Sequence, residues 1–466
     1  MKNLKERRIR YIWNLEFILF EIPINIIKSI FWFISSIIVN TKTWFLFSIK
    51  FSLPYRSIKN HLYIMAWSWS GKSEFLKLIA FYLIKKSRKN AVVIFDPHWD
   101  LAVQIARWKM WRGNSRFALF DWFLKPWFLF CFNPFLIREK SEKEVERMTQ
   151  ALVRSFEWIL ANTFTPNMET MLNYLFPILL RREGSNLKDL KRFVEVWDYA
   201  NNQDLWELGL NSPNPEHREY FENDFADRTL DITKKGLRNR VSSLLSSPNF
   251  AKIVTAEKNS FDFESLLDSW KVIVFNLAKW NYGDSVSQAL WSFLVWHMQY
   301  LAFKRVSVPE KKRNSVFMIM DEFHNFTMKD PKRFESMLDE VRKYWFSLIL
   351  AHQRPKQITP DLRESIEENA QINIKWYSKK DDELKILKRW EFIIEIWGEE
   401  SKAYKTPTFL LKFKTAMTRR KWNLLKDFQL AKYYKNFNKW KNIQWKVIVN
   451  IEDEMKNELE NFIPNL

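Results

Sequence analysis

The chain has 466 residues, 47% of them hydrophobic, and carries a formal net charge of +20. This length suits two or three domains with a sizeable core, and the composition excludes a largely disordered chain. The charge favours a polyanionic partner, either nucleic acid or an anionic membrane surface, although a generally basic proteome gives the same excess. A single cysteine excludes an internal disulfide and favours a reducing compartment.

The first predicted segment, residues 1–57, has a basic start followed by an apolar stretch over 11–53. Its longest run without a charged residue, 29–41, is too short for a clean membrane span. The apolar stretch is also long for a signal peptide and has no small-residue cleavage site. We predict a membrane-associated segment with its basic start on the cytoplasmic side. An amphipathic pair of helices packed on the rest of the chain is the alternative.

An alternation of strands and helices begins in the next segment, residues 58–135. Short apolar strands are predicted at 61–66 and 91–96, with a helix at about 72–87 between them. Residues 136–240 have charged faces and few strand-like runs, so we predict an all-helical insertion there. Strands separated by helices indicate a parallel sheet that is covered on both faces.

The alternation resumes in residues 241–400, which we predict to complete the same sheet. The fold class is therefore predicted as α/β, with a mainly parallel sheet, helices on both faces and an all-helical insertion. Further strands are predicted at 271–277, 315–322, 346–353 and 371–376, and helices near 284–305, 331–344 and 361–369.

The C-terminal region, residues 401–466, is basic. Within it, residues 411–450 hold 11 Lys and Arg residues against one acidic residue, and aromatic residues lie between the charges. This composition suits a nucleic-acid or membrane contact surface. A solvated helical face is the alternative. The interleaved aromatic residues are Tyr433, Tyr434 and Phe437.

A phosphate-binding loop follows the first predicted strand and opens the first predicted helix. In such a loop, backbone N–H groups and the helix N-terminus hold phosphate oxygens. Lys72 would reach the β- and γ-phosphates, and Ser73 would bind Mg²⁺, so we predict ATP and Mg²⁺ as ligands. The loop consists of Ala66, Trp67, Ser68, Trp69, Ser70, Gly71, Lys72 and Ser73.

Two tryptophans in this loop stand where close contact with phosphate requires glycine. The whole chain has 24 Trp and only 7 Gly, whereas glycine makes up about 7% of typical proteins. Several tryptophans also follow strands, in turns that need the positive φ angle that glycine adopts freely. A genome that reads UGA as glycine, translated with a table that reads it as tryptophan, gives this pattern. We therefore predict that many tryptophans are glycines in the cell, among them Trp67, Trp69, Trp99, Trp280 and Trp397; a truly tryptophan-rich chain is the alternative.

Acidic residues end the predicted strand at 315–322. Ligands bind at the carboxyl edge of an open parallel sheet, so these side chains would lie beside the phosphate loop. We expect Asp321 to hold Mg²⁺ through water. We expect Glu322 to orient and activate the water that attacks the phosphate.

Two further candidates flank the strand predicted at 346–353. Gln353 ends the strand, where its amide would sense the γ-phosphate. Arg342 precedes the strand, and an arginine given to a neighbour's phosphate would make hydrolysis depend on oligomerisation. An ordinary surface role is the alternative for Arg342. Residues 96–100, DPHWD, are expected to form a structural turn beside the site.

Together these stretches resemble the additional-strand P-loop ATPases of the HerA/FtsK group, and especially the conjugative coupling proteins of type IV secretion (TraD/TraG type). The resemblance covers roughly 58–130 and 240–380. The matching stretches are AWSWSGKSE, VIFDPHWDL, KVIVFNLAKWNYGD, MIMDEFHNF, VRKYWFSLILAHQ and NAQINIKW.

The resemblance implies a RecA-like motor core, often hexameric around DNA. It maps catalytic roles onto Lys72, Glu322 and Gln353, and a trans-acting role onto Arg342. It also places Ser73 and Asp321 at the metal. Family members carry glycine where this chain has tryptophan at 99, 280 and 345, which supports the recoding.

We predict an ATP-hydrolysing DNA translocase or coupling protein that pumps DNA in conjugative or type IV secretion-type transfer. It would be a homo-hexamer on the cytoplasmic face of the cell membrane, with a cytoplasmic location as the second expectation. It would contact DNA phosphates rather than bases and have secretion or relaxosome proteins as partners. A catalytically inactive, membrane-associated scaffold that binds nucleic acid is the alternative if Trp67 and Trp69 are real. A small-molecule P-loop kinase is a third hypothesis. The long insertion and the basic charge argue against it.

Overall fold

The computed structural model describes most of the chain from residue 53 onward. Residues 56–466 group as one structural unit, and the fold below is that of this unit. The predicted membrane-associated stretch at 11–53 lies almost wholly outside the described residues. No helix among the described residues is long and apolar enough to cross a membrane. The described residues are 53–67, 71–111, 116–195, 202–279, 283–327, 331–376, 391–399, 402–405 and 416–438.

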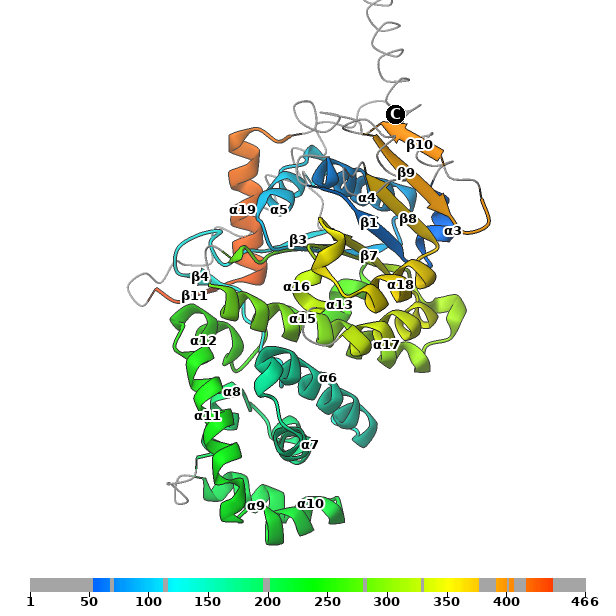
Figure 1. The fold of residues 1–466 in the computed structure, drawn as a ribbon. Helices are drawn as coiled ribbons and strands as arrows, with labels where there is room; N and C mark the ends of the chain where they lie inside the picture. The colour runs from blue at the N-terminus through cyan, green and yellow to red at the C-terminus, as the bar shows by residue number, and fades with distance from the viewer. Residues whose placement is uncertain are drawn as a thin grey trace, which may run out of the picture. The chain divides into compact units, whose positions relative to one another are not determined.

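One mixed sheet forms the centre of the fold (Figure 1). Its strands, within the described ranges, are β1 (Leu62–Met65), β2 (Ala91–Asp96), β3 (Phe117–Phe120), β5 (Val272–Asn276), β6 (Val316–Asp321), β7 (Phe346–His352), β8 (Ile372–Trp376), β9 (Glu391–Ile396) and β10 (Lys402–Lys405). Their order is β10-β9-β8-β1-β7-β6-β2-β5-β3. The strands from β8 to β3 run parallel, whereas β9 and β10 add an antiparallel edge. Strands β1, β2, β5, β6 and β7 are buried along their whole length, as expected for a sheet covered on both faces.

The direction of the crossovers decides which face each helix covers. Helices α4 (Lys72–Lys86) and α5 (Asp100–Ala106) connect β1 to β2 and β2 to β3 in one direction across the sheet. From β5 to β6, β7 and β8 the chain crosses the sheet in the opposite direction. The helices of these crossovers are α15 (Asp284–Lys304), α17 (Pro331–Val341) and α18 (Pro360–Asn369). Because such crossovers are right-handed, the two groups must cover opposite faces. Figure 1 shows this arrangement, and the predicted α/β fold is confirmed.

Helices occupy the chain between β4 (Phe128–Leu129) and β5. The side chain of Thr165 caps α7 (Pro166–Arg181), and Asn186 and Asp189 form a capping box at the start of α8 (Leu187–Phe193). Helix α6 (Glu142–Leu160) packs along α15, where the ring centroids of Phe156 and Phe293 lie 5.8 Å apart. The described helices are α6 (Glu142–Leu160), α7 (Pro166–Arg181), α8 (Leu187–Phe193), α9 (Gln203–Leu210), α10 (Pro215–Glu219), α11 (Asp231–Leu245), α12 (Pro248–Val254) and α13 (Phe263–Asp268).

The outer edge of β3 is covered by α19 (Arg419–Tyr433) rather than by another strand. The Gln429 amide accepts from the Leu119 N–H at 2.8 Å and donates to the Phe117 carbonyl at 3.1 Å. The Tyr434 hydroxyl donates to the Leu119 carbonyl at 2.9 Å. These side chains satisfy the backbone groups that an edge strand leaves open, so the edge cannot pair with another chain.

The same contacts correct one interpretation of the basic C-terminal region. Tyr433 and Tyr434 are buried in the core and are not available to stack on a nucleic acid. Arg419, Arg420 and Lys432 of α19 are exposed. The part of this region that the structure describes therefore offers positive charge to a polyanion, but not the two tyrosines.

Tryptophans dominate the strained backbone positions. Seven non-glycine residues in the described ranges have positive φ, and four are tryptophans. An L-residue in this region costs about 1–2 kcal/mol. Trp99 and Trp345 match the sequence prediction, whereas Trp397 does not, because positive φ there belongs to the adjacent Gly398. Trp280 lies outside the described residues. The four tryptophans are Trp99 (φ 81°), Trp127 (69°), Trp270 (56°) and Trp345 (65°).

Replacing Trp127 by Gly is expected to stabilise the fold by about 1 kcal/mol, because Trp127 has φ 69° and is 60% exposed. Trp376 provides the matched control, since its ring is fully buried and packs on Phe75 and Phe392. Trp376→Gly should destabilise by at least ~3–5 kcal/mol. Urea unfolding measures both effects. A loss of stability in Trp127→Gly comparable with the control would contradict the glycine interpretation.

Candidate functional site

The predicted site residues that the structure describes, Arg342 excepted, gather at the carboxyl ends of three neighbouring strands. Strand β7 lies between β1 and β6, with Met65 opposite His352 and Asp321 opposite Ala351. The phosphate loop therefore follows β1, Gln353 follows β7, and the acidic pair ends β6. Three segments that are far apart in the sequence meet at one edge, which is where open parallel sheets bind ligands.

The described part of the phosphate loop includes the end of β1 and the start of α4. Gly71 has φ 98° and precedes α4 without giving it a side-chain cap, so the first N–H groups of the helix have no side-chain acceptor from their N-cap residue. Lys72 is buried at the first helical position, and Ser73 is exposed beside it. Ala66 is buried at the end of β1. Ser68, Trp69 and Ser70 lie outside the described residues.

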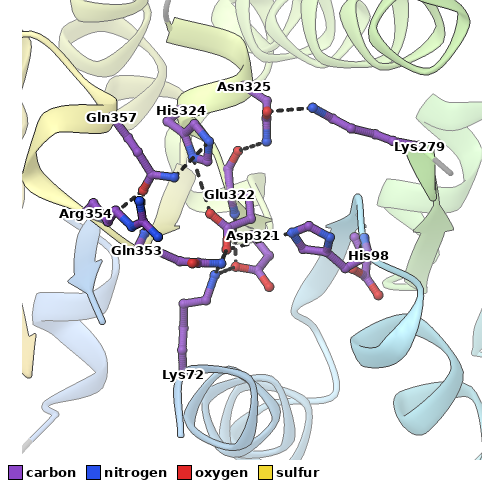
Figure 2. Close-up of polar contacts among 11 residues, drawn as sticks. Lys72, His98, Lys279, Asp321, Glu322, His324, Asn325, Gln353, Arg354 and Gln357 are labelled. Atoms are coloured by element: carbon purple, nitrogen blue, oxygen red, sulfur yellow. Dashed lines mark hydrogen bonds and ion pairs between the residues drawn. The ribbon is translucent and has the colours of Figure 1, made fainter. Parts of the chain in front are cut away.

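Lys72 forms ion pairs with both acidic residues at the end of β6 (Figure 2). Asp321 is 3% exposed and Glu322 is 2% exposed. Burial alone would lower the pKa of Lys72, but the charges of the two carboxylates outweigh it and raise that pKa. The ammonium therefore stays charged and compensates two carboxylates that burial would otherwise destabilise.

Glu322 is held from several sides. Gln353 Nε2 donates to Oε1 at 2.6 Å, and His324 Nδ1 lies 3.3 Å from Oε2. His98 Nε2 is 3.9 Å from Oε1. Burial raises the pKa of Glu322, but the contacts from His324, Lys72 and Gln353 together lower it to about 2. With Lys72 in this position, Glu322 is an ionised carboxylate and a weak base.

A second chain of contacts fixes the backbone behind Glu322. Lys279 Nζ donates to Asn325 Oδ1 at 2.6 Å, and Asn325 Nδ2 donates to the Glu322 carbonyl at 2.8 Å. Glu322 itself has φ 51°, an uncommon angle for a non-glycine residue and one often seen at functional sites. Sequence reasoning missed Asn325, although it stands three positions after Glu322 in the quoted MIMDEFHNF stretch.

The DPHWD stretch forms a turn beside the site. The Asp96 carboxylate accepts from the N–H groups of His98 at 2.8 Å and Ala102 at 2.7 Å, which caps α5. Burial raises the pKa of Asp96 to about 7. The turn places the His98 imidazole near Glu322 (Figure 2).

Arg342 is not brought to this edge of the sheet. It is exposed on the short 3-10 turn η7 (Arg342–Tyr344), immediately before β7. Strand β7 has 7 residues, and a strand of this length spans about 20 Å. Arg342 therefore lies at the opposite edge from Lys72. It cannot reach phosphates held by its own phosphate loop.

The predicted metal pair, Ser73 and Asp321, comes from adjacent parts of this edge. The described residues contain no group of three or more His, Cys, Asp or Glu side chains placed to bind a metal ion. A Mg²⁺ site here would therefore depend on Ser73, Asp321 and the phosphates of a bound nucleotide, which is how Mg²⁺ is commonly held.

Comparisons with known proteins support the family and the fold. A family model described as "Type IV secretory system Conjugative DNA transfer" matches residues 35–379, which is more than half of the chain. Among solved structures, the plasmid coupling protein TrwB in complex with ADP and Mg²⁺ matches with a TM-score of 0.53 and 13% identity, over 79% of this chain and 89% of that one. The trigonal form of TrwBdeltaN70 with sulphate matches with a TM-score of 0.51 and 14% identity, over 79% and 89%. Identities this low show the fold alone. A search of curated proteins gave no match.

Proposed function

Because the chain belongs to the type IV secretory system conjugative DNA transfer family, we propose that it hydrolyses ATP and uses the energy to move DNA. The observation that carries the proposal is the convergence of Lys72, Asp321, Glu322 and Gln353 at one edge of a parallel sheet. ATP turnover measured with and without DNA tests it directly.

The residues present suit a nucleotide. The uncapped N-terminus of α4 and the Lys72 ammonium form an anion site, with the Glu322 carboxylate beside it. When bound, Mg²⁺ would be held by Ser73 and Asp321 and would neutralise charge on the β- and γ-phosphates. Gln353, which already contacts Glu322, is the residue whose amide we expect to contact the γ-phosphate.

The contacts of Lys72 suggest how ATP binding makes Glu322 a stronger base. Phosphates compete with Glu322 for the Lys72 ammonium. Once Lys72 turns to the phosphates, Glu322 loses a charge and a hydrogen bond that lower its pKa. The pKa of Glu322 then rises, and the carboxylate becomes a better acceptor for the proton of the attacking water.

The proposal includes glycine at positions 67 and 69. The Trp67 indole N–H is buried without a hydrogen-bond partner among the described residues, which costs about 1–3 kcal/mol. Its ring centroid lies 5.9 Å from the Arg354 guanidinium carbon. Below, "the glycine chain" means the protein with glycine at positions 67, 69, 99, 127, 270 and 345. If Trp67 and Trp69 are real, an inactive membrane-associated scaffold is the better assignment.

The assembly that we propose is a homo-hexamer on the cytoplasmic face of the membrane, with DNA phosphates as its sequence-independent contact and secretion or relaxosome proteins as partners. The net charge of +20 supports a polyanionic partner. The position of Arg342, remote from its own phosphate loop, supports action between neighbouring copies.

A mixing experiment tests this cooperation between copies. In the glycine chain, Arg342→Ala and Glu322→Gln should each lower ATP turnover at least ~100-fold. Mixing the two inactive proteins should restore turnover, because a copy with an intact Glu322 can then sit beside a copy with an intact Arg342 in the same assembly. Lys343→Ala, an exposed neighbour of Arg342, should retain activity. If the mixture stays as inactive as its components, Arg342 does not act in trans.

A further inference from the structure

A side-chain relay connects Glu322 to the segment that follows β7. This segment contains Gln353 and Arg354 and continues into the short 3-10 turn η8 (Pro355–Gln357). Gln357 Oε1 accepts from the backbone N–H groups of Gln353 at 2.9 Å and Arg354 at 2.6 Å. Because the oxygen is used in this way, the amide cannot be turned around without losing both bonds.

The other end of the Gln357 amide sets the tautomer of His324. Gln357 Nε2 lies 3.1 Å from His324 Nε2 and can only donate. His324 Nε2 is therefore the acceptor, and the ring proton is on Nδ1. Nδ1 lies 3.3 Å from Glu322 Oε2 (Figure 2), so the ring proton is next to the carboxylate, although the two atoms are not aligned as a hydrogen bond.

The two oxygens of Glu322 are thus held by different groups. Gln353 contacts Oε1, and His324 contacts Oε2. Lys72 also contacts Oε1, but a bound phosphate would draw Lys72 away. His324 and Gln353 would then be the closest contacts that fix the plane of the carboxylate, with His98 Nε2 more distant at 3.9 Å from Oε1. Gln353 belongs to the short segment after β7, and His324 is bonded to Gln357 of the same segment.

We propose that His324 is a positioning residue for ATP hydrolysis, which links the orientation of the Glu322 carboxylate through Gln357 to the segment that carries Gln353. This inference rests on the proposed function. A displacement of Gln353 by the γ-phosphate would shift the backbone N–H groups that Gln357 accepts from. The relay passes this displacement to Glu322, so the base is aligned when the γ-phosphate is present.

Three variants of the glycine chain test the relay. His324→Phe keeps a ring of similar size but removes both nitrogens, and kcat should fall about 10–100-fold with the KM for ATP changed less than about twofold. His324→Gln can still donate and accept, so it should restore kcat to within about fivefold. Gln357→Leu should lower kcat, and adding it to His324→Phe should cause little further loss, because the two residues act as one unit.

Controls separate the relay from stability and from the proposed function. His217→Phe, on α10 in the helical region, should leave kcat and KM unchanged. If His324→Phe keeps full kcat, or if it lowers the melting temperature and ADP affinity without rescue by His324→Gln, the relay is wrong. Failure of the proposed function looks different: the unmodified glycine chain would then hydrolyse no ATP, or Glu322→Gln would be fully active.

Discussion

Replacing Glu322 by Gln in the glycine chain is expected to lower kcat for ATP hydrolysis at least ~100-fold, because loss of a general base typically costs this much or more. The affinity for ATP, by contrast, should increase. Glu322 and Asp321 both pair with Lys72 in the absence of nucleotide. An uncharged side chain at position 322 leaves the ammonium with one carboxylate instead of two, so a phosphate competes for it more easily.

Steady-state turnover and titration with a fluorescent ATP analogue measure the two effects separately. Glu399→Gln is the matched control, since Glu399 is exposed at the end of β9 and contacts none of the site residues in the described part of the chain. A Glu322→Gln protein that turns over ATP within tenfold of the glycine chain would exclude Glu322 as the base. Weaker ATP binding would contradict the assigned competition for Lys72.

The second large effect is expected at the phosphate loop. The printed chain, with Trp67 and Trp69, should show no measurable ATP binding, whereas Gly at both positions should raise affinity at least ~100-fold. The physical reason is that backbone N–H groups can surround phosphate oxygens only where no large side chain intervenes. Trp397→Gly, at an 81% exposed position remote from the loop in sequence, should restore no binding.

The mass of the tryptic peptide covering residues 60–72, from protein made in its native organism, checks the same prediction independently. A peptide lighter than the printed sequence by two tryptophan-to-glycine differences establishes the recoding in this loop. A peptide with the printed mass shows that the tryptophans are real. In that case the motor assignment loses its phosphate site, and the scaffold assignment takes its place.

Much of the sheet was predictable because its strands are short apolar runs separated by helices. Strands β1, β2 and β5 to β8 lie within one or two residues of their predicted limits. Strand β9 was missed; it alternates buried and half-buried residues, as β8 does, and joins the sheet by antiparallel pairing with β8. The role of Gln429 was also invisible, since it bonds to residues 310 and 312 positions away.

The site was predictable to the extent that its residues belong to local motifs. Lys72, Asp321, Glu322 and Gln353 each end or follow a strand, and the parallel sheet brings those ends together. His324 could not be assigned from its position alone, because its role depends on a contact with a turn 33 residues further along. The relay is a property of the fold, whereas the motifs are properties of short segments.

The most direct test of the motor assignment is the rate of ATP hydrolysis by the glycine chain with and without DNA. We expect low turnover without DNA and several-fold faster turnover with DNA, whatever the DNA sequence, and no turnover in the Glu322→Gln variant under either condition. It also predicts that stimulation weakens steeply as salt rises, since the contacts are to phosphates. Equal turnover with and without DNA, by a protein that stays monomeric, would contradict the account.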